Sequence, residues 1–322
     1  MLMRSVNDSG PVTTTRNLAT PAAATVTVLM WASAFVVIRA AGETFSPGVM
    51  ALLRMAFAVA ALTVIVVFRQ ARRPRGTRVL PRGRPLAIVL TYGVAWFGGY
   101  MIALNWAEQH VDAGTAALLV NVAPIIVAVL ATVILGEPFH RPLAIGIAIA
   151  FAGVVLITVG GGPHADLLGI GLGLLAAVLY ASGVLLQKVA LRDVDAVTAT
   201  WLGAVAGLVA TLPWAPAAID EVGAAAPGAI AATAFLGIGP TAIAFITWAY
   251  ALARTDAGVM AATTLVVPAI VIVLSWALLG ELPTPLRIVG GALCLIGVAV
   301  SRGLIRPARR PVQATTSTVP QP

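Results

Sequence analysis

The sequence predicts an all-α membrane protein with ten transmembrane helices, arranged as two inverted five-helix repeats. Composition is the first observation behind this prediction: 60% of the 322 residues are hydrophobic and 10% are charged, whereas about 25% of the residues of a soluble domain are charged. The second observation is a series of long apolar runs, and the third is an internal repeat. Together they exclude a soluble globular protein.

Apolar runs of about 20 residues are long enough to cross the hydrocarbon layer as helices. Eight such runs contain no Asp, Glu, Lys or Arg, and two more contain a single arginine, Arg54 or Arg287. The runs are apolar on every face, unlike the alternating strands of a membrane barrel. The ten expected spans are 17–38, 46–68, 85–107, 113–136, 142–165, 167–187, 196–219, 222–253, 257–280 and 283–301.

Both ends of the chain are polar, and we expect disordered cytoplasmic tails at 1–17 and 306–322. The first apolar run ends at Arg39 without a cleavage site of the A-x-A type, which favours an uncleaved span over a signal peptide. Cys294 is the single cysteine, so a disulfide within one chain is excluded.

Basic residues indicate the orientation, because Lys and Arg accumulate in cytoplasmic loops. With both termini in the cytoplasm, every Lys and Arg except Arg39, Arg54 and Arg287 falls on the cytoplasmic side. The arginine-rich loop 69–84 fits a segment beside anionic lipid. Despite a net charge of +8, the expected partner is therefore the lipid bilayer of the plasma (inner) membrane and not nucleic acid.

An internal repeat is the most specific signal in the sequence. Residues 112–154 align without a gap with residues 256–298, an offset of 144 residues, and the alignment pairs Asp-Ala-Gly, Pro and Gly-Glu in both copies. Residues 31–39 similarly align with residues 180–188 and keep an aromatic residue, an Ala-Ser pair and a terminal cation. The predicted units are 18–159 and 166–305.

Each predicted unit has five spans, an odd number, so the second unit would insert upside down relative to the first. Transporters with inverted repeats bind their substrate near the bilayer midplane and open the site to either side in turn. The repeat therefore favours a secondary transporter that works by alternating access.

These motifs resemble the EamA-like branch of the drug/metabolite transporter superfamily. The W-x-S-x-F-x-x-x-R pattern at 31–39 is similar to the first span of the family, and PGVMALLR at 47–54 is similar to the second. ALNWAEQHVDAG (103–114) and ALARTDAG (251–258), each followed by Pro and Gly-Glu, resemble its paired third-to-fourth and eighth-to-ninth span signatures.

The resemblance covers roughly residues 20–305 and departs at Gly203, the counterpart of Arg54, so any role of this arginine is asymmetric. It implies ten helices in two EamA units, and efflux or exchange of small metabolites or amino acids. It does not imply a particular substrate.

Aromatic and polar side chains within the spans are the candidate substrate-binding residues. Three aromatic residues of the third span recur at every fourth position and are expected to stack on one helical face. They suit a pocket for an organic solute and, equally, a core or lipid-facing stripe. The candidates are Trp31, Tyr92, Trp96, Tyr100, Asn121, Tyr180, Thr241, Trp248 and Thr264.

Arg39, Arg54 and Lys188 are the candidate gating or charge residues. Burial of Arg54 in the second span would cost about 2.5–3.5 kcal/mol, so we weigh snorkelling toward the outer surface, a pair with Glu43 or Glu108, and attraction of an anionic substrate. Arg39 and Lys188 occupy equivalent positions at opposite mouths, as gates or as ordinary snorkelling ends.

Pro124 and Pro268 are the candidate hinges. Each proline removes one backbone hydrogen bond and frees the carbonyl four residues earlier, at Val120 or Thr264. Such a carbonyl either lines a cavity or is satisfied by a neighbouring helix.

Other repeated residues have expected structural roles. Two glutamates that directly follow their spans are expected to bond helix ends, and two pairs of glycines spaced seven apart are expected to allow close helix packing. These residues are Glu137, Glu281, Gly146, Gly153, Gly290 and Gly297.

Several chemistries are absent from the sequence. No predicted span carries a deep acidic residue, His110, His140 and His164 have no metal-ligand spacing, and there is no phosphate-binding P-loop. We therefore expect no cofactor, no metal and no ATP-driven pump. Transport is then either facilitated diffusion or coupled to protons through residues near the mouths of the pathway. No feature of the sequence indicates an oligomeric state.

The sequence therefore predicts a multi-pass transporter, not an enzyme, that exports or exchanges a small amphipathic metabolite such as an amino acid. The alternative is an intramembrane enzyme acting on a lipid or isoprenoid substrate. An enzyme of that kind would need carboxylates, histidines or a nucleophile that converge within the membrane, and the spans supply only scattered hydroxyls.

Overall fold

A computed structural model of the chain describes residues 18–41, 44–72, 80–110, 119–159, 166–279 and 284–304. These residues form helices and turns and contain no strand, which confirms the all-α prediction. Several predicted features lie outside the described residues: Glu43, the first copy of Asp-Ala-Gly (112–114), His164, Gly280 and Glu281, and the side chain of Arg39.

Apolar helices make up most of the described chain. Six helical segments have the length and hydropathy of a membrane span: Pro47–Ala71, Arg84–Ala107, Leu167–Ala190, Ala196–Ala224, Pro227–Leu252 and Ala257–Leu278. Four more described helices are apolar but shorter, at Ala19–Ala34, Ala123–Leu135, Arg141–Ile157 and Pro285–Ser301.

The first half contains α1 (Ala19–Ala41), α2 (Pro47–Ala71), α3 (Arg84–Tyr92), the π-helix η1 (Gly93–Tyr100), α4 (Met101–Ala107), α6 (Ala123–Leu135) and α7 (Arg141–Val159). The second half contains α8 (Leu167–Ala190), α9 (Ala196–Thr211), the 3-10 turn η2 (Leu212–Trp214), α10 (Ala215–Ala224), α11 (Pro227–Leu236), the π-helix η3 (Gly237–Ile243), α12 (Ala244–Leu252), α13 (Ala257–Thr263), the 3-10 turn η4 (Thr264–Val266), α14 (Val267–Leu279) and α15 (Pro285–Ser301).

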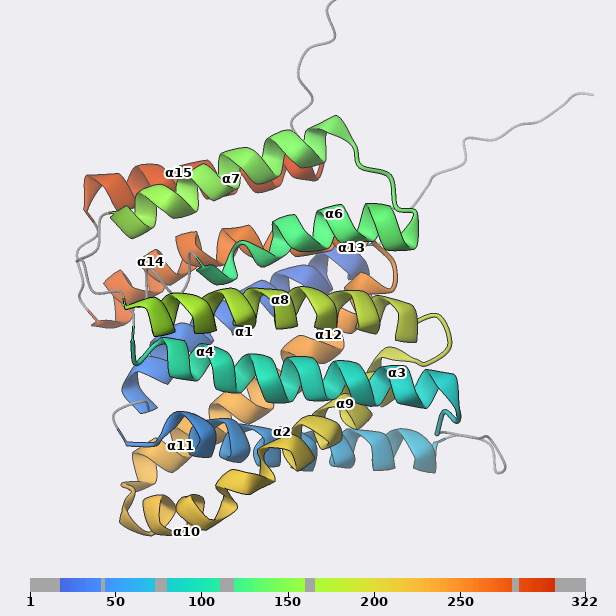
Figure 1. The fold of residues 1–322 in the computed structure, drawn as a ribbon, viewed down its shortest axis with the longest axis vertical. Helices are drawn as coiled ribbons and strands as arrows, with labels where there is room; N and C mark the ends of the chain where they lie inside the picture. The colour runs from blue at the N-terminus through green and yellow to red at the C-terminus, as the bar shows by residue number, and fades with distance from the viewer. Residues whose placement is uncertain are drawn as a thin grey trace, which may run out of the picture.

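The helices run roughly parallel to one another as a single bundle (Figure 1). Helices α7 and α15 pack together along one edge, and α10 lies at the opposite edge, where it contacts α2. Helix α8 contacts α3, η1, α4 and α6, and α1 contacts α11, α12 and α14. Helices α1 and α8 therefore each pack against elements of the other half.

One boundary differs from its prediction. The seventh and eighth spans were expected to separate around Asp220 and Glu221, but the helix runs through both and ends at Ala224. Glutamate is a good helix former, and the Glu221 carboxylate accepts a hydrogen bond from the backbone N–H of Ser46 at 2.8 Å. The chain instead turns at 225–226, before Pro227.

Two π-helices replace α-helical turns at positions related by the repeat offset. η1 begins at Gly93 and η3 begins at Gly237, which is 144 residues later. The Cα of Gly93 faces the backbone of Gly203 in α9, and that of Gly237 faces the backbone of Arg54 in α2, with no room for a Cβ at either position. Each π-helix therefore packs closely against the second helix of the other half.

Glycines also let α7 and α15 cross closely, as expected. Gly146 faces Gly297, and Gly153 faces Gly290. A Cβ added to Gly153 would lie 2.5 Å from the Gly290 carbonyl oxygen, and one added to Gly290 would lie 2.6 Å from the Gly153 carbonyl oxygen. The absence of side chains at these four positions therefore sets the separation of the two helices.

One end of the bundle carries most of the described basic residues. Arg69 at the end of α2 pairs with Asp195 at the start of α9, with 3.0 Å between Nη1 and Oδ1. Figure 1 shows the ends of α2, α6, α8 and α12 and the starts of α3, α7, α9 and α13 on this side, at the right. We call it the basic end, and it carries Arg69, Arg72, Arg82, Arg84, Arg141, Lys188, Arg192, Arg254 and Arg302.

Candidate functional site

Five aromatic side chains converge where the two halves meet. We call Trp31, Trp96, Tyr180, Phe245 and Trp248 the central aromatic cluster. The ring centroids are 5.0 Å apart for Trp31 and Trp248, 5.1 Å for Trp96 and Tyr180, and 5.0 Å for Trp96 and Phe245. Helix α1 and η1 of the first half and helices α8 and α12 of the second half supply these rings.

Four of the predicted substrate-binding residues lie in this cluster, namely Trp31, Trp96, Tyr180 and Trp248. Tyr100 packs against its edge, 5.7 Å from Tyr180 between ring centroids. Phe245 was not predicted from the sequence, although it lies one turn before Trp248 on α12, at a spacing that places two side chains on one helical face.

Tyr92 does not join the cluster, so the expected stacking of Tyr92, Trp96 and Tyr100 on one face is wrong. Hydrogen bonds in a π-helix run to the fifth residue, and Tyr92 accordingly contacts Phe97, at 6.0 Å between centroids. Its hydroxyl donates to the Ala199 carbonyl of α9.

Polar atoms inside the cluster are left without partners. The Nε1 atoms of Trp96 and Trp248 and the hydroxyl of Tyr180 are buried and have no hydrogen-bond partner among the described residues. The Tyr180 hydroxyl lies beside the Thr264 hydroxyl without a hydrogen bond of normal geometry. Trp31 differs, because its Nε1 donates to the Pro240 carbonyl at 3.1 Å.

Arg54 is buried, with 7% of its surface exposed, so the snorkelling position is wrong. Its Nε donates to the Thr241 hydroxyl at 2.7 Å, and that hydroxyl donates to the Leu236 carbonyl at 2.8 Å. Glu108 and Tyr100 lie within electrostatic reach of the guanidinium. Thr241 therefore belongs to the environment of Arg54. Glu108, one of the two glutamates considered as a partner of Arg54 from the sequence, lies near enough to supply an opposite charge.

The two candidate hinges are built differently. Pro124 lies in the first turn of α6, after a non-helical turn at Asn121 and Val122. Pro268 lies at the start of α14, directly after η4, and there the carbonyl expected to be free is satisfied, because Thr264 accepts the Val267 N–H. The 3-10 turn thus replaces the bond that Pro268 removes, while the Thr264 hydroxyl donates to Ala261 of its own helix.

Lys188 joins elements of both halves at the basic end. Its Nζ donates to the carbonyls of Leu252 at 2.8 Å and Thr255 at 2.5 Å, and lies 3.7 Å from Glu137 Oε1. The other carboxylate oxygen of Glu137 accepts the Ala257 N–H at 2.6 Å. The expectation that Glu137 bonds a helix end is confirmed, and the helix is α13 of the opposite half.

Gln187 is a buried polar residue that the sequence analysis did not include. Its side chain is fully buried, and neither amide atom has a hydrogen-bond partner in the part of the chain that the structure describes. It lies beside the Tyr92 hydroxyl and precedes Lys188 in α8. Its sequence signal is a lone amide in an apolar span, which is costly to bury without a partner.

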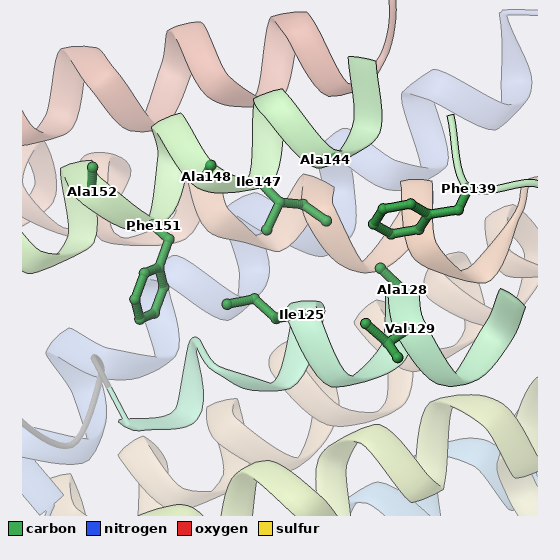
Figure 2. Close-up of a pocket in the computed structure, with 9 residues that line it drawn as sticks. All are labelled: Ile125, Ala128, Val129, Phe139, Ala144, Ile147, Ala148, Phe151 and Ala152. Carbon is green, nitrogen blue, oxygen red and sulfur yellow. The ribbon is translucent and has the colours of Figure 1, made fainter. Parts of the chain in front are cut away.

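A separate groove of about 420 Å³ opens between α6 and α7 (Figure 2). Phe139 and Phe151 extend into it from opposite ends of its α7 side, with Ile147 between them and Ile125 across from them. It contains none of the predicted site residues and no polar side chain that could recognise a polar solute. Its lining is Ile125, Ala128, Val129, Phe139, Ala144, Ile147, Ala148, Phe151 and Ala152.

Metal ligands do not gather anywhere in the described ranges, where no group of three or more His, Cys, Asp or Glu residues could hold an ion. The buried polar side chains of the described interior are instead indole, hydroxyl, amide and guanidinium groups.

A solved structure that is described only as a crystal structure of protein has a similar fold. It matches with a TM-score of 0.74 at 20% identity, and the match covers 89% of this chain and 97% of that one. At this identity the likeness concerns the fold alone.

Curated relatives match most of the chain. A "probable terminal-alkyne amino-acid exporter" of Streptantibioticus cattleyicolor is 37% identical, with 85% of this chain and 90% of the relative covered. The "uncharacterized transporter YdfC" of Bacillus subtilis is 32% identical, with 84% and 86% covered. A "probable amino-acid metabolite efflux pump" of Escherichia coli K12 is 25% identical, with 86% and 93% covered.

The model of the EamA-like transporter family matches the chain twice, over residues 21–159 and 167–303. These two matches take in all of the described helices that form the central aromatic cluster. The chain therefore belongs to the EamA-like transporter family and is a multi-pass membrane protein.

Proposed function

We propose that this protein is a secondary transporter that exports or exchanges a small amphipathic metabolite, an amino acid or a similar solute. The observation that carries the proposal is the central aromatic cluster, to which both family units contribute rings and in which three polar atoms have no partner among the described residues. Aromatic rings with polar edges suit a solute that has both apolar and polar parts.

The relatives support the class of solute. Two of them are named as exporters or efflux pumps of amino acids or amino-acid metabolites. Those names apply to the relatives, and together with the cluster they favour export of an amino-acid-like solute by this chain over an intramembrane enzyme.

The proposed mechanism is alternating access between two inverted five-helix units, at 18–159 and 166–305, with ten spans in all. The ungapped offset of 144 residues supports it, as do the equivalent contacts of Gly93 with α9 and Gly237 with α2. Inverted units of this kind can exchange arrangements around one central site. Pro124 and Pro268 begin the α-helices that would move relative to it.

The basic end is proposed to face the cytoplasm, with both termini on that side of the plasma membrane, since basic loops stay in the cytoplasm. Gln70 lies beside Arg69 at the basic end, and Gly223 lies on α10 near the Glu221–Ser46 bond at the other end. In a Cys294→Ser background, an impermeant maleimide applied to intact cells should label Gly223→Cys and not Gln70→Cys. The opposite labelling would reverse the orientation.

Reconstitution into liposomes tests transport. Vesicles loaded with one labelled amino acid should release it faster when the same unlabelled amino acid is outside, because exchange returns the carrier loaded. A proton gradient applied in the same vesicles separates facilitated diffusion from proton coupling. The absence of flux for a full amino-acid panel contradicts the proposal.

A further inference from the structure

We propose that the indole N–H groups of Trp96 and Trp248, together with the Tyr180 hydroxyl, form a donor site that binds the carboxylate of the transported solute. This inference rests on the proposed function and names the chemical group that the site recognises.

The three proposed donors are buried and unused within the described part of the protein. Trp96 and Trp248 are fully buried, and Tyr180 is 6% exposed. Their three polar atoms have no hydrogen-bond partner among the described residues. Buried polar groups in folded proteins are nearly always bonded, and each exception needs an explanation, of which a bound water, ion or ligand is one.

The three donors also lie close together. Trp96 lies 5.1 Å from Tyr180 and 5.9 Å from Trp248 between ring centroids. One small acceptor group bound beside Trp96 could therefore be reached by more than one donor. Since an indole N–H donates and cannot accept, the two tryptophans select a group with acceptor oxygens.

Two similar side chains in the same region differ from these donors. Trp31 belongs to the cluster, yet its N–H is already bonded to the Pro240 carbonyl. Tyr92 lies on the same helical segment as Trp96, yet its hydroxyl is bonded to the Ala199 carbonyl. The protein thus satisfies two similar side chains internally, whereas the N–H groups of Trp96 and Trp248 have no partner among the described residues and the Tyr180 hydroxyl has only the nearby Thr264 hydroxyl.

The surroundings of the donors include charged groups. Tyr100 packs against Tyr180 and lies within electrostatic reach of Arg54 and of its opposite charge Glu108. A buried cation with its counter-charge therefore lies near the ring that flanks the donors. A carboxylate accepts stronger hydrogen bonds than a neutral oxygen does, and the flanking ring faces can pack against the apolar part of the solute or attract its ammonium group.

An internal explanation of the unused donors is that each N–H points at the face of a neighbouring ring. Trp96 and Trp248 are nearly perpendicular, with an interplanar angle of 85°, and N–H to ring contacts are weak stabilising interactions. In that case the two tryptophans contribute packing and no ligand selectivity, and the experiment below separates the two explanations.

Binding of three related probes to protein in nanodiscs, measured by calorimetry, tests the donor site. The probes are L-phenylalanine, 3-phenylpropionate, which lacks the ammonium group, and 2-phenylethylamine, which lacks the carboxylate. We expect the wild-type protein to bind both carboxylates and to bind the amine at least about 10-fold more weakly, the loss expected for a charged hydrogen-bond acceptor.

The variants Trp96→Phe, Trp248→Phe and Tyr180→Phe should each weaken binding of the carboxylates by about 10-fold while the affinity for 2-phenylethylamine stays constant. The matched controls Trp276→Phe, at an exposed position on α14, and Tyr92→Phe, outside the cluster, also remove an N–H or a hydroxyl, and they should leave the preference for carboxylates unchanged. Thermal unfolding of each variant checks that it is folded, and the three independent variants keep the test informative if one of them is not.

The inference is wrong if the wild-type protein binds neither carboxylate, if it binds the amine equally well, or if the test and control variants behave alike. Flux of the amino-acid panel through wild-type protein reports separately on the proposed function. Flux with unchanged selectivity in the three variants would overturn the donor site alone.

Discussion

The polar side chains in the interior of this bundle fall into two groups, those bonded within the protein and those without a partner, and Arg54 and Thr241 belong to the first group. The Arg54 Nε is bonded to the Thr241 hydroxyl, which passes the hydrogen bond on to the Leu236 carbonyl. The chain of bonds links α2 to the π-helical segment η3. In contrast, the indole N–H groups of Trp96 and Trp248 end in no bond among the described residues. We infer that the first group of side chains holds the two halves together and that the second is available to a solute.

Replacement of Thr241 by valine tests the structural part of this division. Thr241→Val keeps the shape of the side chain and removes the acceptor of a buried guanidinium N–H, so we expect a loss of about 1–3 kcal/mol in stability. Thermal unfolding in detergent measures the change. The control is Thr241→Ser, which keeps the hydroxyl and should lose much less. Equal midpoints for the valine and serine variants would show that the bond contributes no stability.

At the scale of whole elements, the sequence predicted more of the composition of the site than of its geometry. Trp31 and Tyr180 were found through the repeat, because aligned residues occupy equivalent places in the two halves. The π-helix η1 was not predicted, since no local pattern at 93–100 separates a π-helix from an α-helix. It follows from close packing of Gly93 on the backbone of α9, and it directs Tyr92 away from Trp96. The sequence predicted that Glu137 would bond a helix end, and the structure shows that this is the start of α13. The pairing of Glu137 with Lys188 was not predicted, because it depends on how the two halves pack.

The α7–α15 crossing yields a prediction that concerns helix packing. Gly297→Ala places a methyl group 2.5 Å from the Gly146 carbonyl oxygen, and we expect such overpacking to cost about 1–3 kcal/mol. Gly291→Ala is the matched control on the same helix, because its methyl group would meet nothing closer than 3.6 Å, and both variants gain the same helix propensity. Unfolding midpoints should fall for Gly297→Ala alone. A similar midpoint for both variants would mean that the two helices separate easily.

The start of α8 yields a prediction about pH. The Asp166 carboxylate accepts the Gly169 N–H at 2.7 Å and lies 2.9 Å from His110 Nδ1. These interactions, the backbone N–H first, hold the pKa of Asp166 below its ordinary value. A carboxyl whose pKa is lowered by folding stabilises the protein above its unfolded pKa, near 4, and the stabilisation is lost as the pH falls through the folded pKa.

Asp166→Ala should therefore unfold at a lower temperature than wild type at neutral pH, and the difference should shrink as the pH falls below about 4. Asp166→Asn keeps a good N-cap without a titrating group, so its unfolding temperature should lack this contribution to the pH dependence. Melting curves between pH 3 and pH 7 in detergent give the comparison. A difference between Asp166→Ala and wild type that is independent of pH contradicts the assignment.

At the scale of the whole molecule, charged side chains join the two family units at the basic end. Glu137 of the first family unit bonds the start of α13, and Lys188 bonds the end of α12 and the turn that follows it. Both charged side chains are largely shielded from solvent, at 18% exposure for Lys188 and 13% for Glu137, where charged hydrogen bonds are strongest. Under the proposed mechanism, opening of this end requires the contacts of Glu137 with Ala257 and Lys188 to break, because these contacts join the two units.

Weakening these bonds should therefore shift the protein toward a form that is open at the basic end. Loss of a hydrogen bond to a charged group is worth about 1.5–3 kcal/mol, which is a change of about 10-fold or more in a two-state equilibrium.

The reporter is Ala261→Cys in a Cys294→Ser background, because Ala261 is fully buried on α13. We expect Glu137→Gln and Lys188→Met to accelerate its reaction with a maleimide by about 10-fold. Arg254→Met is the control, since Arg254 lies on the same turn and bonds Tyr250 of its own helix, so its loss should leave the rate unchanged. If neither Glu137→Gln nor Lys188→Met changes the rate, these contacts only cap helix ends, and opening of the basic end does not depend on them.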